Sequence, residues 1–77
     1  NIKIFYKIIN IDSTIICEKP KLSRFKNKIR INISKIINLP IDSVSVKATT
    51  SEGLGIIGKN MAIACKTVVL LEKNESV

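Results

Sequence analysis

The order of apolar and polar positions along the chain predicts three strands. Residues 8–16 are rich in isoleucine and end before Pro20, a pattern typical of a strand that is buried on both faces. Residues 44–48 carry an apolar side chain at every second position, which indicates a half-buried strand. Residues 61–72 contain a run of β-branched side chains and therefore favour a third strand over a helix.

Between the first two strands, residues 22–37 predict one amphipathic helix. Its apolar residues recur at steps of three and four, which places them on one stripe: Leu22, Phe25, Ile29, Ile33, Ile36 and Ile37. Ser23 is the expected N-cap, and Asn38 followed by Pro40 is expected to end the helix. Residues 49–60 hold all three glycines, so they predict a loop or a short helical turn.

The order strand, helix, strand, loop, strand predicts an α/β (α+β) layer pair, a sheet with a helix on one face. Residues 1–7 fit no pattern, and residues 74–77 are expected to be a frayed end. A chain of 77 residues forms one domain at most, and a domain of this size buries only about 60% of its unfolded surface.

The composition limits the catalytic and metal-binding chemistry that this chain can perform. There is no histidine, which removes the commonest general base and the commonest zinc ligand, and we expect both cysteines to be buried free thiols. The net charge of +7 favours anionic partners, whether nucleic acid, phosphorylated metabolites or a membrane surface. The longest apolar stretch is too short to span a bilayer and no signal peptide is visible, so we expect a soluble protein.

The spacing of the glycines partly matches two phosphate-binding motifs. Gly53, Gly55 and Gly58 spell G-x-G-x-x-G, but a dinucleotide fingerprint needs more chain after its last glycine than is present here. The same stretch through Lys59 resembles a P-loop, yet Asn60 stands where a Ser or Thr should hold Mg²⁺. We prefer the simpler interpretation, a loop in which the backbone passes something closely.

A run of hydroxyl side chains at the end of the second strand is a stronger candidate site. Thr49, Thr50 and Ser51 can donate to phosphate oxygens, and the small Ala48 lets a planar group approach the backbone. Glu52 is a hard oxygen ligand of the kind that Mg²⁺ or Mn²⁺ prefers. The alternative is purely structural: an N-capping hydroxyl with an acidic residue in the first turn of a short helix.

Residues 18–21 follow the first strand and form the second candidate. Lys21 precedes the predicted helix and could meet a phosphate there, although a solvated turn has the same pattern. If the strands at 8–16 and 44–48 are parallel neighbours, both loops open on one crevice at the carboxyl ends of the strands.

Two runs of residues resemble one known family. N-I-D-S-T-I-I-C-E-K-P-K-L at 10–22 and V-S-V-K-A-T-T-S-E-G-L-G at 44–55 are similar to the motifs of the 2-C-methyl-D-erythritol 2,4-cyclodiphosphate synthases. The helix around Arg30 and the tail A-I-A-C-K-T-V-V-L-L at 62–71 align in the same order. The resemblance extends over residues 6–71, and two motifs at the right spacing make it specific.

The resemblance implies a phosphorus–oxygen lyase of the non-mevalonate (MEP) isoprenoid pathway. Such an enzyme converts 4-diphosphocytidyl-methylerythritol 2-phosphate to the 2,4-cyclodiphosphate and releases CMP. The family's fold is a mixed β-sheet with helices packed on one face, and three copies form a homotrimer with active sites between subunits. Residues 1–77 would be the C-terminal portion of one such domain. Its location would be the apicoplast or plastid stroma in a eukaryote, or the cytoplasm in a bacterium.

By the same resemblance, the run from 17 to 23 would surround the cytosine, Ala48 would lie beside the base, and Thr50 would be the catalytic residue that stabilises the transition state. Glu52 would hold Mg²⁺ or Mn²⁺ on the diphosphate. The substrate-binding residues implied are Cys17, Glu18, Lys19, Pro20, Lys21, Leu22, Ser23, Ala48, Thr49, Thr50, Ser51, Glu52, Ile56 and Lys59.

The chain also departs from the family. Ile56 stands in place of a usual Phe, Lys59 in place of Arg, and residues 60–62 in place of Gly-Glu-Gly. The family's catalytic Zn²⁺ is held by an Asp-x-His and a further His, so we expect the zinc ligands in an N-terminal half outside this chain. The alternative function is a small basic nucleic-acid-binding module, for which Phe5, Tyr6 and Phe25 are too few to form a stacking platform.

Overall fold

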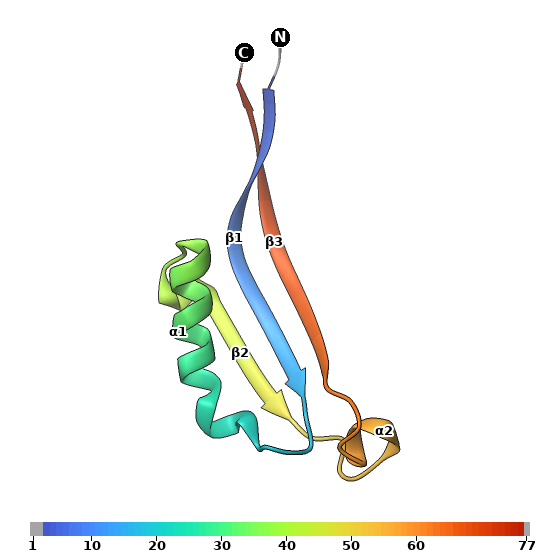
Figure 1. Ribbon diagram of the computed structural model, residues 1–77. Coiled ribbons are helices and arrows are strands. Elements are labelled where there is room, and N and C mark those ends of the chain that lie inside the picture. Colours follow the sequence, from blue (N-terminus) through green and yellow to red (C-terminus); the bar gives the residue numbers. More distant parts are fainter. Residues whose placement is uncertain (1–2, 77) are drawn as a thin grey trace.

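The computed structural model describes residues 3–76 as one three-stranded sheet with helices at its side and at one end (Figure 1). The elements follow in the order β1 (Lys3–Ile16), η1 (Leu22–Phe25), α1 (Lys26–Ile37), η2 (Ile41–Ser43), β2 (Val44–Thr49), α2 (Gly55–Gly58) and β3 (Ala64–Ser76). The predicted order of strand, helix, strand, loop and strand is confirmed. None of the helices in this part of the chain is long and apolar enough to cross a membrane.

The sheet has the strand order β2-β1-β3 and is mixed. β1 pairs in parallel with β2, from Ile11 opposite Val44 to Ile16 opposite Thr49. It pairs antiparallel with β3 along nearly its whole length, with a register shift between Ile8 and Asn10. The mixed sheet that the family resemblance implied is therefore confirmed, and the parallel pair is the part that matters for the site.

Both strands of the long β1–β3 ribbon run further than the sequence pattern predicted. β1 begins at Lys3, although residues 1–7 fit no pattern, and β3 continues to Ser76, so the expectation of a frayed end from residue 74 was wrong for residues 74–76. Asn1, Ile2 and Val77 lie outside the described residues. The ribbon extends well past β2 and α1, and its two ends lie side by side (Figure 1).

Helix α1 covers β2 through an arc that is shifted from the predicted stripe. Ile33 and Ile37 are half-buried as expected, but Ile36 is 82% exposed, so its placement on the packed stripe was wrong. The reason lies in the rotation of 3.6 residues per turn. Arg30 and Ser34 are also half-buried, so the packed arc is turned toward them and Ile36 falls at its opposite margin.

Of the two predictions about the ends of α1, the one for the start was wrong and the one for the end is confirmed. Ser23 is not an N-cap, because residues 22–25 form a 3₁₀ turn and Phe25 occupies the N-cap position without a side-chain bond. Asn38 does end the helix: it adopts the left-handed conformation with φ 54° and its N–H donates to the carbonyl of Ser34.

The core within this chain is small. The buried apolar residues are Cys17, Val44 and Val46, and Ser13 is buried with its hydroxyl bonded to that of Thr67 at 3.0 Å. Most of β1 is only half-buried, so the expected burial on both faces is not achieved by the described residues. Cys65 is exposed, which corrects the expectation that both free thiols are buried.

Candidate functional site

The carboxyl ends of β1 and β2 lie side by side, and this adjacency creates the candidate site. Parallel pairing runs to Ile16 opposite Thr49. It continues for one more bond, because the N–H of Cys17 donates to the carbonyl of Thr49 at 3.1 Å. The loops that follow the two strands therefore open on one crevice, as parallel α/β topology requires.

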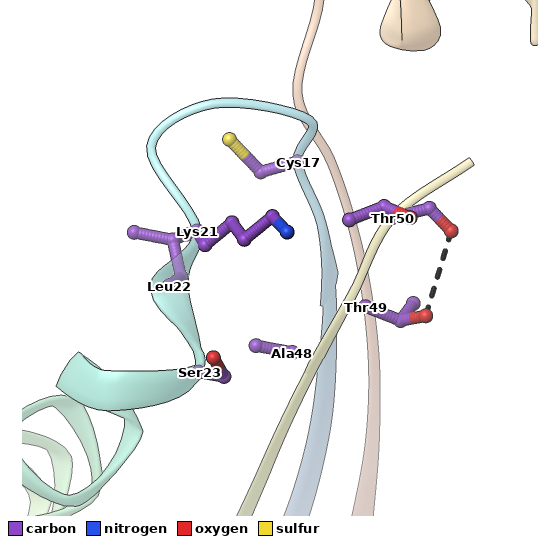
Figure 2. Close-up of a pocket in the computed structure, with 7 residues that line it drawn as sticks. All are labelled: Cys17, Lys21, Leu22, Ser23, Ala48, Thr49 and Thr50. Atoms are coloured by element: carbon purple, nitrogen blue, oxygen red, sulfur yellow. Dashed lines mark hydrogen bonds between the residues drawn. The ribbon is translucent and has the colours of Figure 1, made fainter. Parts of the chain in front are cut away.

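A cavity of about 120 Å³ occupies this crevice (Figure 2). It is lined by Cys17, Lys21, Leu22, Ser23, Ala48, Thr49 and Thr50. One wall comes from the loop after β1 and from η1, and the other from the end of β2. The two segments that carry the family motifs thus meet at one place, although 24 residues lie between Ser23 and Ala48 in the chain.

Side-chain directions in the cavity follow strand alternation (Figure 2). Ala48 points toward the loop that carries Lys21 and Ser23, and its small side chain leaves open space against the backbone of β2. Thr49 points to the other side of β2, so it lines the cavity mainly through its backbone. An apolar floor with a lysine at its edge suits a flat, partly polar ring attached to an anionic group.

Cys17 ties the two walls together. Its side chain is only 3% exposed, and its Sγ donates to the carbonyl oxygen of Lys19 at 3.3 Å. Its backbone N–H meanwhile bonds to Thr49 on the other wall. One residue therefore fixes both the turn of the first loop and the distance between the loops.

A compact turn after β2 holds the hydroxyl side chains. The N–H of Glu52 donates to Oγ1 of Thr50 at 3.2 Å, and Ser51 Oγ donates to the carbonyl of Leu54 at 3.0 Å. Thr49 Oγ1 reaches the carbonyl of Thr50 at 3.4 Å. Because Thr50 Oγ1 acts as an acceptor in this turn, its own O–H can still donate to a ligand.

Glu52 has an unusual backbone conformation. Its φ is 55°, in the left-handed region, where a residue other than glycine costs about 1–2 kcal/mol. Its side chain is exposed, so packing does not explain the choice of glutamate. Strained backbone of this kind concentrates at functional sites, and an exposed carboxylate is the type of ligand that a hard divalent cation prefers.

Backbone geometry explains the glycines in residues 53–58. Gly53 and Gly55 have φ of 79° and 67°, and a Cβ on Gly58 would clash with the backbone of Gly53. The interpretation of a loop with a close backbone approach is thereby confirmed. α2 is only four residues long, so neither glycine motif is followed by the helix that it requires.

The structure brings together only part of the predicted set. Ser51 and Glu52 follow the cavity wall without lining it, and Ile56 and Lys59 lie exposed on or after α2. Glu18 is half-buried, and its Oε2 has no hydrogen-bond partner among the described residues. The roles of all these residues remain predictions.

The sequence motifs did not single out Arg24, which is exposed. With Lys19, Pro20, Lys21 and Ser23 it lines a shallow hollow that adjoins the cavity. Its guanidinium lies 5.2 Å from the centre of the Phe25 ring, which restrains the side chain. Its position directly after Ser23 was the available signal.

The aromatic residues and the acidic residues test two expectations, a stacking platform and a metal site. Phe5 and Tyr6 lie on the distant part of β1, whereas Phe25 lies in η1, so these aromatic residues form no common platform (Figure 1). Among residues 3–76 there is no group of three or more acidic, cysteine or histidine side chains that could hold a metal ion. The expectation that Glu52 binds Mg²⁺ or Mn²⁺ stays a prediction.

Comparison with known proteins identifies the family. The family model of the YgbB family matches residues 3–72. The chain belongs to the YgbB family. It is 48% identical over 69 residues to the 2-C-methyl-D-erythritol 2,4-cyclodiphosphate synthase of Clostridium tetani, which covers 90% of this chain and 44% of that protein. The synthase of Clostridioides difficile is 50% identical over 66 residues, covering 86% of this chain and 41% of that protein.

Solved structures agree in fold. IspF of Plasmodium falciparum in a CDP complex superimposes with a TM-score of 0.81 at 41% identity, over 86% of this chain and 42% of that chain. The Plasmodium vivax synthase gives a TM-score of 0.84 at 38% identity, over 90% and 46%. The resemblance inferred from the two motifs is confirmed. The chain spans less than half the length of each of these relatives.

Proposed function

We propose that this chain is the nucleotide-binding portion of a 2-C-methyl-D-erythritol 2,4-cyclodiphosphate synthase. The observation that carries the proposal is the cavity in which both family motifs meet, at the carboxyl ends of parallel strands. A solved CDP complex of a relative 41% identical to this chain supports a cytidine nucleotide as the ligand. The substrate would be 4-diphosphocytidyl-methylerythritol 2-phosphate.

In this proposal the cytosine ring lies against Ala48 and the backbone of residues 17–23, where the cavity lining is partly apolar. The diphosphate then extends toward the turn that carries Thr50 and Glu52. Lys21, whose side chain reaches into the crevice, offsets the phosphate charge (Figure 2). The site works by holding phosphates and placing donors, which is what phosphoryl transfer requires of a protein.

The reaction that follows is an intramolecular displacement. An oxygen of the 2-phosphate forms a bond to the β-phosphorus, the bond from that phosphorus to the bridging oxygen breaks, and CMP leaves with the bonding electrons. Thr50 would donate its O–H to a phosphate oxygen as negative charge develops there. This makes the enzyme a cyclising phosphorus–oxygen lyase that releases CMP.

Two metal ions belong to the proposal. Glu52 would bind Mg²⁺ or Mn²⁺ shared with the α- and β-phosphates, and Zn²⁺ would be bound by residues outside this chain. When bound, these cations supply positive charge to the phosphate oxygens. Without a cation, the Glu52 carboxylate would repel the diphosphate that lies beside it.

Calorimetry on the complete protein tests the nucleotide assignment. We expect CDP to bind more tightly than ADP with Mg²⁺ present, and to bind more weakly with EDTA. The variant Ala48→Val should weaken CDP binding about tenfold or more, because overpacking a site costs about 1–3 kcal/mol. Ala64→Val is the matched control, since Ala64 is half-buried on a strand but lies outside the cavity.

Equal or tighter binding of ADP would contradict a cytosine-selective pocket. Equal losses of CDP affinity in Ala48→Val and Ala64→Val would place the nucleotide elsewhere. Binding of duplex DNA with a steep dependence on salt, together with no binding of CDP, would favour the nucleic-acid alternative.

A further inference from the structure

The charge of this chain is concentrated in one segment. Of its 13 basic and 6 acidic residues, seven basic and no acidic residues fall within residues 19–38, which leaves six of each sign elsewhere. The basic residues of this segment are Lys19, Lys21, Arg24, Lys26, Lys28, Arg30 and Lys35. The entire net charge of +7 therefore resides in the segment 19–38, which we call the basic segment.

The basic segment begins at the cavity and leads away from it. Lys21 lines the cavity, and Lys19 and Arg24 line the hollow that adjoins it. The first turn of α1 follows directly after η1 and lies at the same end of the sheet as the tips of β1 and β2 (Figure 1). Lys26 and Lys28, on this first turn, are exposed and line neither the cavity nor the hollow.

Charges placed in this way act on a ligand before it binds. Fields of one sign around a cleft raise the association rates of oppositely charged ligands by about 10- to 10³-fold. The effect reaches about one Debye length, which is ~30 Å at ~0.01 M ionic strength and ~8 Å at physiological ionic strength. A nucleotide diphosphate approaching the cavity from this side passes the first turn of α1 within that range at low salt.

We propose that the basic segment steers anionic nucleotides into the cavity, and that Lys26 and Lys28 raise the association rate without contacting the bound ligand. This inference rests on the proposed function, because it presumes that the cavity binds a cytidine nucleotide. It assigns a kinetic role to residues outside the binding site and to a charge asymmetry that folding alone does not require.

The test is stopped-flow association of CDP carrying a ribose-linked fluorophore with the complete protein. Lys26→Gln/Lys28→Gln is compared with Lys7→Gln/Lys73→Gln, which removes the same charge outside the basic segment and far from the cavity. Lys73 lies opposite Tyr6 on β3, and this part of the ribbon is about 30 Å along the strand from the tip of β1 at Ile16. Lys7 lies on the part of β1 that extends past β2.

At about 0.01 M ionic strength we expect the Lys26/Lys28 double variant to lose about three- to tenfold in association rate, with an unchanged dissociation rate. The Lys7/Lys73 control should lose less than about twofold at the same ionic strength, because its charges lie about one Debye length (~30 Å) from the cavity. The difference between the variants should vanish in about 1 M salt, where the Debye length is ~3 Å. The association of uncharged cytidine should be the same in all proteins.

Equal losses in the two double variants would overturn steering by the basic segment. So would a change confined to the dissociation rate, which would mean that Lys26 or Lys28 contacts the bound ligand. If CDP binds the parent protein but its association rate changes neither with the charge substitutions nor with salt, steering is contradicted and the proposed function stands. If CDP does not bind the parent protein at all, the proposed function itself fails.

Discussion

Thr50 shows how one side chain can serve both the fold and the chemistry. Its Oγ1 accepts the N–H of Glu52 at 3.2 Å, which is the capping role that a purely structural interpretation assigns to it. A hydroxyl that accepts one bond still has its proton to donate. Thr50 also lines the cavity, so the two interpretations are compatible and a substitution must separate them.

We predict that Thr50→Val lowers turnover far more than CDP affinity. A donor that strengthens its bond only as charge develops contributes to the transition state and little to the ground state. Loss of one such donor costs about 2.7–4 kcal/mol in well-studied oxyanion sites, and we expect the lower end, about a hundredfold in turnover. The measurement is turnover and CDP affinity in the complete, metal-loaded enzyme.

Thr50→Ser is the matched control, because it keeps the hydroxyl and removes only a methyl group. It should retain most of the turnover. A folded Thr50→Val enzyme with unchanged turnover would show that the hydroxyl serves only the turn at Glu52.

At the scale of elements, Arg30 fastens α1 to the start of β2. Its Nε donates to the carbonyl of Val44 at 2.6 Å, and its Nη2 donates to the carbonyl of Ile41 at 2.9 Å. The contact with Asp42 at 3.8 Å adds little, since the Asp42 side chain is 98% exposed. Arg30 therefore acts mainly through backbone carbonyls, and it sets how α1 lies along β2.

We predict that Arg30→Met lowers the free energy of unfolding by about 2–3 kcal/mol, because hydrogen bonds to a charged group contribute about 1.5–3 kcal/mol and the two carbonyls lose their donor. Arg30→Lys should recover only part of this loss, since an ammonium cannot fork to two carbonyls as a guanidinium does. Urea denaturation of the complete protein provides the measurement. Lys35→Met, at an exposed position of the same helix, should change stability by less than about 0.5 kcal/mol.

The elements also show what local sequence could predict. The periodicity of residues 22–37 and the alternation of residues 44–48 arise from packing within this chain, and both predicted elements are present. The outer parts of β1 and β3 could not be predicted, because their strand conformation depends on pairing with each other across more than 60 residues of sequence. Phe5 and Tyr6 are exposed on this part of β1. The sequence around them therefore shows no alternation of polar and apolar positions.

The candidate site was predictable to the extent that it lies on those local elements. Once the strands ending at Ile16 and Thr49 are parallel neighbours, the positions of Lys21 and Ala48 follow. The positions of Ile56 and Lys59 do not follow, because they depend on left-handed backbone at Glu52 and at two glycines in the preceding turn. Motif resemblance placed these residues in the site without a physical argument for their direction.

At the scale of the molecule, the chain exposes more surface than a self-contained domain. Its accessible surface is 6044 Å², whereas a compact protein of 8.5 kDa should expose about 4,700 Å². Its radius of gyration is 16.1 Å, against about 11.5 Å for a compact chain of this length. Side chains that are half or more exposed include Ile4, Phe5, Tyr6, Val68 and Leu70.

Polar atoms support the same conclusion. Asp12 Oδ1 and Glu18 Oε2 are buried without a hydrogen-bond partner among the described residues, a state that costs about 1–3 kcal/mol for each group. Further protein packed on this sheet could donate to both oxygens and cover the apolar ribbon. We therefore expect the fold to be stable only when the rest of the polypeptide and neighbouring copies surround it.

We predict that the complete protein is a homotrimer whose stability depends on assembly. Static light scattering should report the mass of three copies, because the resemblance implies three and the excess apolar surface here needs a partner. If assembly and folding are coupled, the melting temperature should rise with protein concentration, since mass action stabilises the associated state. A monomer that is fully active and melts at the same temperature at every concentration would contradict the prediction, and would require the exposed β1–β3 ribbon to be covered within one subunit.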